Sequence, residues 1–314
     1  CLQDVPPGCA ASIQQLKRVN DLKPVPGGIH PIVYAFFDGD DRLDRHAMRR
    51  QAEACIAAGS HGIAALGLAT EVRKLTPGER RQVMHWLIED VAGRLPVAIT
   101  IYGRSVDEQA AFVAEAAAAG AAWVILQPPP ERIDEAELIR FFGRIADRSP
   151  VPVAIQNAPQ YIGFGLTADG IIDLCRQHAN VRLLKAEASA VELAHLHATL
   201  GDTVSIFNGR GGLELPDILR AGCAGLIPAP ELLDIHLRIH AAYVSGDAAR
   251  ADALYARILP CITFLMQSVD QFLCYGKRIT ARRLGLEHVN DRDPCQKPDP
   301  FGLACMERYS RNLP

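Results

Sequence analysis

The sequence predicts an α/β protein, a (β/α)8 TIM barrel with a C-terminal helical extension. Eight short apolar segments alternate strictly with stretches of helical periodicity, which is typical of a parallel sheet. These segments are apolar on both faces, as strands covered by helices are. The 314 residues suffice for such a barrel, which needs roughly 250. A doubly wound open sheet stays an alternative, because alternation alone does not show that the strands close.

The eight predicted strands are runs of β-branched and apolar residues. They are Ile29–Phe37, Gly62–Leu68, Pro96–Tyr102, Ala122–Gln127, Val151–Gln156, Val181–Glu187, Thr203–Asn208 and Ala224–Pro228. Helical periodicity predicts a helix in each gap between them: Asp44–Ala58, Thr76–Val91, Ser105–Ala119, Ile133–Ile145, Thr167–His178, Ala190–Leu200 and Gly211–Ala221. Several of these begin with residues that cap helices well, such as Asp44, Thr76 and Ser105.

The two ends of the chain depart from this alternation. Residues 1–27 contain Pro and Gly and are predicted to form an N-terminal leader, which precedes a barrel core over residues 28–231. Residues 232–314 contain no further strand pattern, and we expect C-terminal helices and a tail packed on the barrel. The helices are predicted at Leu232–Ser245, Asp247–Met266 and Gln271–Leu284. Residues 289–314 are charged and contain Pro, which predicts an extended tail.

Composition and net charge indicate a globular protein and argue against several classes of partner. A hydrophobic share of 49%, a net charge of −3 and a mean hydropathy of +0.05 describe an ordinary globular protein. This charge gives no reason to expect nucleic-acid or membrane-surface partners, and no apolar run reaches the ~18 residues of a membrane helix. The nine cysteines form no CxxC pair, which favours reduced thiols and a cytoplasmic location. An enzyme and a binding protein both remain open.

Lys185 is the most informative residue for function. In a parallel barrel the active site lies at the C-terminal ends of the strands, and Lys185 lies near the end of the sixth predicted strand. Placing an ammonium in an apolar strand costs several kcal/mol, on the order of a buried charge, unless it is paired or neutralised. A lysine that attacks a carbonyl and forms a Schiff base is one explanation. A lysine with its tip in solvent or in an ion pair explains the pattern equally well.

Glu187 follows two residues later and therefore points to the same side of the strand as Lys185. The two charges could simply neutralise each other. A carboxylate at this place is also suited to carry a proton at the carbon next to an imine.

Asn208–Gly212 is a glycine-rich turn that opens the seventh helix, and such turns bind anions through free amides. We interpret it as a substrate loop in which Arg210 contacts a distal carboxylate or hydroxyl; a surface charge is an equally good interpretation. The histidine pairs His195/His197 and His236/His240 lack a third ligand nearby in the sequence. No metal site and no cofactor are therefore predicted.

Taken together, these residues resemble the dihydrodipicolinate synthase/N-acetylneuraminate lyase superfamily, Schiff-base (β/α)8 enzymes that act on 2-oxo acids. The resemblance spans roughly residues 28–285 and rests on five motifs: Gly67–Glu71 with Leu75, Asn157 with Pro159, Lys185, Gly209, and Lys277–Gly285. It implies that Lys185 forms an imine with pyruvate or a longer 2-oxo acid. It also implies that the Gly67–Glu71 loop holds the substrate carboxylate, and that the chain forms a homo-oligomer, a tetramer or dimer.

The sequence departs from the superfamily at several positions. Leu68 and Ala69 replace the two threonines of the usual Gly-Thr-Thr-Gly-Glu loop, and Gln156, which does not titrate, replaces the acid/base tyrosine. Tyr161 stands where the synthases have the arginine that holds aspartate semialdehyde. Three further positions lack superfamily residues: Pro128–Pro130 replaces the relay tyrosine, and Gly211 and Gly212 replace the Asp-Glu pair of the sialic-acid lyases. These departures argue against dihydrodipicolinate synthesis.

Lys185-x-Glu187 together with Glu214 is similar to the 2-keto-3-deoxy sugar-acid dehydratases of the superfamily, in which two glutamates do acid/base work. The resemblance implies a lyase that dehydrates such an acid, with Lys185, Glu187 and Glu214 as catalytic residues. The alternatives are a class I pyruvate-dependent aldolase and a non-catalytic protein that binds a 2-oxo acid. The expected substrate-binding residues are Gly67, Leu68, Ala69, Thr70, Gln156, Asn208, Gly209 and Arg210.

Overall fold

The computed structural model describes residues 27–311 and 313, so residues 1–26 of the predicted leader lie outside the described residues. Eight parallel strands form one sheet: β1 (Gly28–Ile29), β2 (Ile63–Ala65), β3 (Val97–Ile101), β4 (Trp123–Leu126), β5 (Val153–Asn157), β6 (Val181–Ala186), β7 (Ser205–Asn208) and β8 (Gly225–Leu226). Every predicted strand segment overlaps one of them; β1 starts one residue before its predicted segment and β5 ends one residue after its own.

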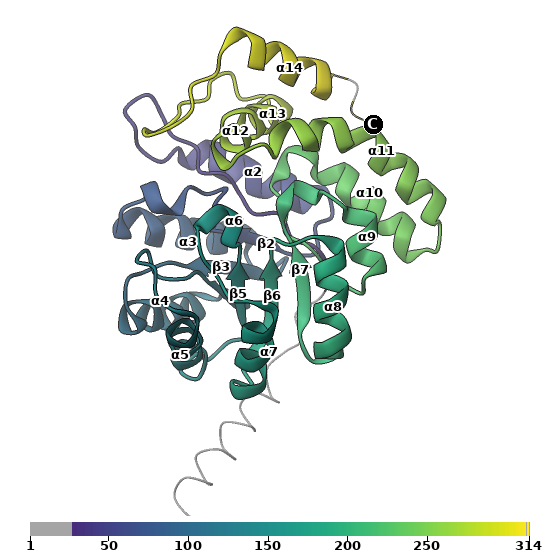
Figure 1. Cartoon of the computed structure of the whole chain (residues 1–314). Helices are drawn as coiled ribbons and strands as arrows, with labels where there is room; N and C mark the ends of the chain where they lie inside the picture. Colours follow the sequence, from purple (N-terminus) through teal and green to yellow (C-terminus); the bar gives the residue numbers. More distant parts are fainter. Residues whose placement is uncertain (1–26, 312, 314) are drawn as a thin grey trace, which may run out of the picture.

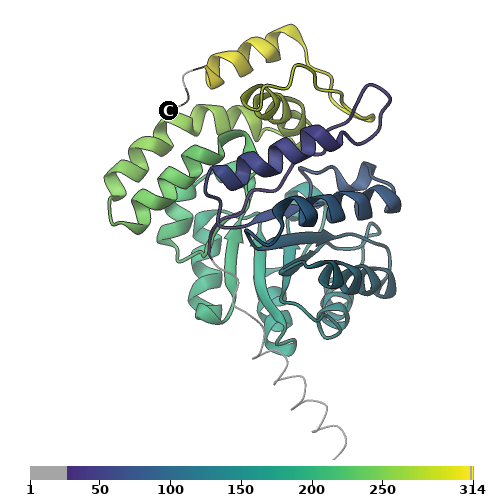
Figure 2. The same ribbon diagram turned by 180° about the vertical axis from the view of Figure 1, so that it is seen from behind.

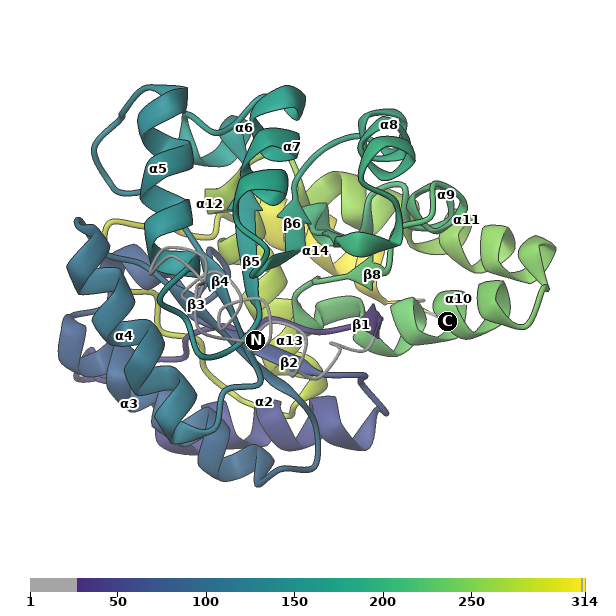
Figure 3. The same ribbon diagram turned by 90° about the horizontal axis from the view of Figure 1, so that it is seen from below.

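The strand order is that of a sheet curled into a barrel (Figure 1, Figure 3). It runs β1-β8-β7-β6-β5-β4-β3-β2, so each strand lies beside the next one in sequence, without the reversal of a doubly wound sheet. The two edges meet where the chain after β1 pairs with β2, at a parallel bridge between Ile32 and Ala64. The N–H of Val33 donates to the Ala64 carbonyl over 2.9 Å at the same place. The predicted eight-stranded parallel sheet is confirmed.

Helices cover the outside of the strands (Figure 1, Figure 2). Those that follow β1 to β8 are α2 (Arg45–Ala57), α3 (Pro77–Val91), α4 (Val106–Ala119), α5 (Glu135–Ala146), α6 (Pro159–Ile162), α7 (Ala168–Gln177), α8 (Ala190–Leu200), α9 (Leu215–Arg220) and α10 (Leu233–Val244). The predicted caps are present: the Asp44 side chain accepts from the Ala47 N–H, and Thr76 forms a capping box with Glu79. α10 packs against β1 and α9.

The seventh predicted helix, Gly211–Ala221, is shorter than expected, because α9 begins only at Leu215. Arg210, Gly211, Gly212 and Glu214 all have φ between 53° and 84°. This left-handed backbone cannot continue a right-handed helix. The segment instead forms the 3-10 turn η3 (Arg210–Gly212). The other 3-10 turns of the described residues are η1 (Val72–Lys74), η2 (Gly201–Thr203) and η4 (Pro230–Leu232).

Beyond α10 the chain forms α11 (Ala248–Leu265), α12 (Val269–Gln271), the π-helical turn η5 (Phe272–Gly276), α13 (Lys277–Arg283) and α14 (Pro300–Ser310). The expectation of an extended tail over 289–314 is wrong for α14, which packs on α11 (Figure 1). Asp299 caps this helix by accepting from the Gly302 N–H over 2.9 Å, and Pro300 occupies its first turn. We overlooked this start signal.

The core lies between the strands and the surrounding helices. All residues of the eight strands are buried or nearly so, and Trp123 stacks with Phe207 at a ring-centroid distance of 5.9 Å. The cysteines of the described residues are free thiols. No single described helix is long and apolar enough to cross a bilayer; α11 and Val269–Arg283 meet that test only as a pair bent by 111°.

Candidate active site

A pocket opens at the C-terminal ends of the strands. Five of the predicted site residues line it: Leu68, Ala69, Lys185, Glu187 and Arg210. The other pocket-lining residues are Ile32, Tyr161, Gly211, Ile227, Pro228, Ala229, Met266, Val269 and Phe272. Gly67, Thr70, Gln156, Asn208, Gly209 and Glu214 are not among the lining residues.

Lys185 and Glu187 form a buried ion pair in this pocket. The Lys185 Nζ donates to Glu187 Oε1 over 2.5 Å, and both residues are at most 6% exposed. The side chains meet because residues two apart in a strand point to the same face. The structure therefore excludes the alternative of a lysine tip in solvent, and it places the carboxylate within proton-transfer distance of the amine.

The second oxygen of Glu187 is held by the loop after β7. The main-chain N–H of Arg210 donates to Glu187 Oε2 over 2.6 Å. A Cβ on Gly209 would lie 2.3 Å from both Glu187 oxygens, so only glycine leaves room for the carboxylate. Gly209 thus makes room for the Glu187 carboxylate, and its expected contact with substrate stays a prediction. Glu187 is fixed in one orientation by a donor on each oxygen.

Arg210 connects the two predicted catalytic glutamates. Its N–H binds Glu187, while its Nη1 donates to Glu214 Oε2 over 2.9 Å and to the Ala188 carbonyl over 3.1 Å. The Glu214 N–H donates to the Tyr255 hydroxyl over 2.9 Å. Glu214 therefore stands behind Arg210 rather than on the pocket wall. Arg210 and Glu214 are non-glycine residues with left-handed φ, a strain of about 1–3 kcal/mol each that clusters at functional sites.

The loop Gly67–Glu71 after β2 contributes two residues to the pocket wall and contains three main-chain amides without a protein partner. Leu68 and Ala69 line the pocket, and within residues 27–311 the N–H groups of Leu68, Ala69 and Thr70 donate to no protein acceptor. The Thr70 hydroxyl is not available to a ligand, because it donates to the Val33 carbonyl over 2.6 Å and accepts from the Leu66 N–H. Side-chain binding by Thr70 is thus ruled out, whereas its amide remains open.

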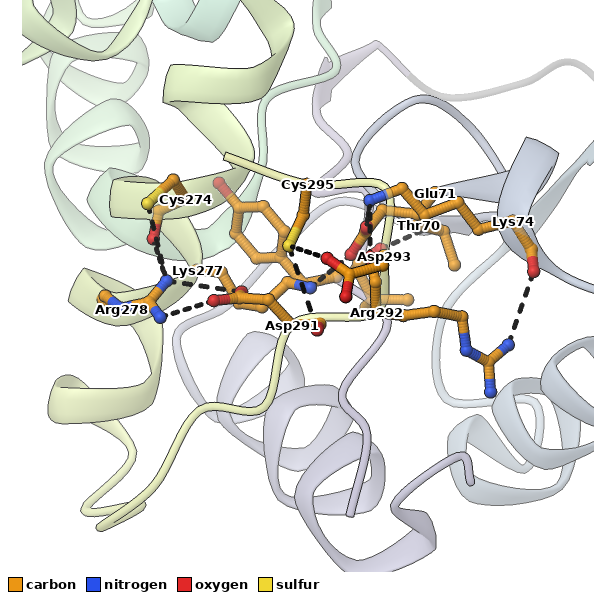
Figure 4. Close-up of polar contacts among 12 residues, drawn as sticks. Thr70, Glu71, Lys74, Cys274, Lys277, Arg278, Asp291, Arg292, Asp293 and Cys295 are labelled. Carbon is orange, nitrogen blue, oxygen red and sulfur yellow. Dashed lines mark hydrogen bonds and ion pairs between the residues drawn. The ribbon is translucent and has the colours of Figure 1, made fainter. Parts of the chain in front are cut away.

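The end of this loop is anchored by buried charges (Figure 4). The Glu71 carboxylate accepts from Lys74 Nζ over 2.6 Å and forms an ion pair with Lys277 of α13, in which both side chains are at most 2% exposed. Lys74 also donates to the Arg292 carbonyl over 3.0 Å, and the Arg292 guanidinium lies 4.1 Å from the centre of the Phe37 ring. Segments that follow the barrel therefore hold the loop from behind.

Gln156 and Asn208 lie next to Lys185 but have structural partners. Gln156 pairs with Lys185 in strand register, and its Oε1 accepts from Gln127 Nε2 over 2.8 Å. The Gln156 Nε2 is buried, and within the described residues it has no hydrogen-bond partner. Asn208 Nδ2 donates to the Ala188 carbonyl over 2.9 Å, which ties the β6 and β7 loops together.

Two features of the pocket were missed at the sequence level. The side chains of Met266, Val269 and Phe272 close it from the helices after the barrel. Tyr161, at the start of the segment after β5, also lines it; burial and then the nearby Glu187 charge raise the pKa of its hydroxyl. No local pattern could reveal these contacts, because they join segments that are far apart in the sequence.

His236 supports the η3 loop from inside the fold. It is fully buried, and burial lowers the pKa of its imidazole to about 4. A Cβ on Gly212 would lie 2.5 Å from His236 Nε2, so the histidine fills the space that the glycine leaves. No group of three or more metal-ligating side chains gathers anywhere in the described part of the chain.

The comparison with known proteins identifies the family of this chain. The model of the dihydrodipicolinate synthetase family matches residues 25–298. The chain belongs to this family. The family is made up of lyases, and the resemblance inferred from the sequence is thereby confirmed.

Relatives within the dihydrodipicolinate synthetase family include more than one activity. An L-2-keto-3-deoxyarabonate dehydratase of Azospirillum brasilense is 31% identical over 242 residues, which cover 75% of this chain and 78% of the relative. A 4-hydroxy-tetrahydrodipicolinate synthase of Methanoculleus marisnigri is 28% identical, over 74% and 81% of the two chains. A crystal structure of a putative dihydrodipicolinate synthetase from Pseudomonas aeruginosa superposes with a TM-score of 0.84 at 25% identity, over 92% of this chain and 99% of that one.

Proposed function

We propose that the protein is a Schiff-base lyase that dehydrates a 2-keto-3-deoxy sugar acid. The observation that carries the proposal is the buried lysine–carboxylate pair at the strand ends, with Lys185 Nζ 2.5 Å from Glu187 Oε1. The likeness to an L-2-keto-3-deoxyarabonate dehydratase supports the choice of substrate class. The expected homo-oligomer, a dimer or tetramer in the cytoplasm with a small-molecule substrate and no nucleic-acid or membrane partner, stays a prediction.

The first step is imine formation. Glu187 Oε1 takes a proton from the Lys185 ammonium, and the free amine attacks the C2 carbonyl of the substrate. Glu187 then returns this proton to the carbinolamine oxygen, which leaves as water; this yields an iminium between Nζ and C2 and restores the Glu187 carboxylate. The amides of Leu68, Ala69 and Thr70 supply hydrogen bonds to the substrate carboxylate.

The second step is loss of water across C3 and C4. The iminium acidifies the C3 protons, and Glu187 removes one as a general base. The electron pair forms a C3–C4 double bond while the C4 hydroxyl leaves as water, with its proton from Glu214. In this step the substrate takes the place of Glu214 at the Arg210 guanidinium, and the released Glu214 side chain then contacts the C4 hydroxyl. Water then hydrolyses the unsaturated iminium and returns free Lys185, so the net change is the loss of one water.

A class I aldolase is the second candidate, and Tyr161 favours it. The tyrosine hydroxyl lines the same pocket and can accept the C4 hydroxyl proton as the C3–C4 bond breaks. This reaction would use the Lys185 imine in the same way and release pyruvate. The product therefore decides between the two candidates.

Two measurements test the proposal. Incubation with pyruvate and borohydride, followed by mass spectrometry, should show a reduced adduct on Lys185 and none in Lys185→Ala. A panel of 2-keto-3-deoxy acids scored for water loss and for pyruvate release should show water loss. Pyruvate release would establish the aldolase instead, and the absence of any adduct would favour the binding-only interpretation.

A further inference from the structure

The walls of the active-site pocket differ in polarity from one side to the other. Its four polar side chains, Tyr161, Lys185, Glu187 and Arg210, come from the segments at the ends of β5, β6 and β7. The remaining walls come from the ends of β1, β2 and β8 and from the helices after the barrel. The side chains on those walls are all apolar: Ile32, Leu68, Ala69, Ile227, Pro228, Ala229, Met266, Val269 and Phe272.

Most polar groups on the side formed by the ends of β5, β6 and β7 already have a partner or a proposed catalytic role. Lys185 and Glu187 carry the covalent and proton-transfer steps in the proposed function, on which this inference rests. The Arg210 Nη1 binds Glu214 and the Ala188 carbonyl. Among the lining side chains in the described part of the chain, the Tyr161 hydroxyl and Arg210 Nε, which has no hydrogen-bond partner there, are left to bind a substrate hydroxyl, and both lie on the polar side.

The apolar wall is fixed by packing and reaches the polar side. A Cβ on Gly211 would lie 3.0 Å from Met266 Sδ, so the thioether packs directly on the loop that carries Arg210. The Phe272 ring packs on the buried Tyr34 ring at a centroid distance of 5.5 Å. These contacts hold apolar side chains against the ligand space. A substrate hydroxyl against this wall would lose its water partners without replacement.

We propose that the pocket selects a 4-hydroxy-2-oxo acid whose chain beyond C4 is a short alkyl group. Such a substrate carries a terminal methyl group at the position where a 2-keto-3-deoxy sugar acid carries a hydroxymethyl group. The methyl group buries apolar surface against Met266 and Val269, which favours it. An extra hydroxyl in an apolar pocket lowers kcat/KM by about tenfold to a hundredfold.

A matched pair of substrates tests the inference, because the two differ by a single hydroxyl. They are 4-hydroxy-2-oxopentanoate and 4,5-dihydroxy-2-oxopentanoate, each with the same configuration at C4. The first should lose water with a kcat/KM at least about tenfold higher than the second. Half-saturating concentrations for borohydride trapping on Lys185 give the same comparison without requiring turnover.

Two variants test whether the apolar wall is the cause. Val269→Thr keeps the side-chain volume but adds a hydroxyl at the pocket, and it should reduce the preference by about two- to tenfold, the value of one hydrogen bond. Val244→Thr makes the same change on the outer face of α10, where the residue is 69% exposed, and should leave the preference unchanged.

Each outcome separates this inference from the proposed function. Equal kcat/KM values, or a preference for the dihydroxy acid, would overturn the inference while leaving the imine chemistry in place. An unchanged preference in Val269→Thr would also overturn it, because the wall would not be the source. No adduct on Lys185 with either acid would remove the proposed function, and the inference with it.

Discussion

Gly209 shows how one missing side chain shapes the site. The space next to its Cα is taken by the Glu187 carboxylate, and a Cβ would lie 2.3 Å from both oxygens. Gly209→Ala should therefore displace Glu187 while leaving Lys185 on its strand. We expect borohydride trapping to persist but turnover to fall by about 10²-fold or more, the scale of general acid–base catalysis. Gly39→Ala is the matched control, since nothing lies within 4 Å of its Cβ position. Wild-type turnover in Gly209→Ala would contradict this account of Glu187.

The buried carboxyl group of Glu231 is expected to make the stability of the fold depend on pH. Burial raises the pKa of its carboxyl from 4.5 to about 7, and it accepts a hydrogen bond from the Tyr34 hydroxyl over 3.0 Å. A raised folded-state pKa stabilises the fold fully below pH 4.5, and that stability is lost as the pH rises through 7. The loss is at most about 3 kcal/mol, from 1.36 kcal/mol for each pKa unit.

Replacing Glu231 by glutamine should remove this pH dependence. Urea unfolding at pH 5 and pH 8 should show a smaller fall in unfolding free energy for Glu231→Gln than for the wild type. Exposed Glu287→Gln provides the control. If the fall were the same in Glu231→Gln and the wild type, Glu231 would not be its source.

At the scale of elements, α13 and the segment after it act on the pocket through the Gly67–Glu71 loop (Figure 4). Removing Lys277 alone would leave the buried Glu71 carboxylate with Lys74 as its remaining ion-pair partner, and we expect this to destabilise the fold. The double variant Glu71→Gln/Lys277→Met removes both charges and is expected to fold. Its loop amides lose their anchor, so the half-saturating concentration for pyruvate trapping should rise about tenfold, the loss of about one charge-assisted hydrogen bond.

A ketone without a carboxylate separates this effect from general damage. Trapping of acetone on Lys185 should be the same in the double variant and the wild type, because acetone does not use the loop amides. Lys297→Met, at an exposed ion pair with Asp293, is the control for a lost lysine. Equal losses for pyruvate and acetone would show that the ion pair serves only the fold.

Elements were predictable from the sequence where local chemistry decides them. Helix starts at Asp44, Thr76 and Ser105 carry their own capping signal, and α2, α3 and α4 begin one residue after it. The η3 loop was not predictable, because Arg210 and Glu214 adopt left-handed φ that only the surrounding contacts can enforce.

At the scale of the whole molecule, the sequence predicted that Lys185 and Glu187 lie side by side but not the pocket around them. Lys185 and Glu187 are linked by the two-residue period of a strand, which holds in any fold that contains the strand. Leu68 and Ala69 were also located correctly on the pocket wall. The contacts that Thr70, Asn208 and Gly209 make with the protein were not predicted, because their partners come from other strands. Met266, Val269 and Phe272 reach the site only through the packing of helices after the barrel.

The central claim is that Lys185 and Glu187 act together, one as the imine lysine and the other as the proton carrier. Exchange of the pyruvate methyl protons with deuterated water, followed by NMR, tests it most directly, because exchange requires both the imine and a base at C3. We expect exchange in the wild type and none in Lys185→Ala. In Glu187→Gln, exchange should fall by about 10²-fold or more while borohydride still traps pyruvate on Lys185. Exchange at the wild-type rate in Glu187→Gln would contradict the account and reduce Glu187 to a charge partner of the lysine.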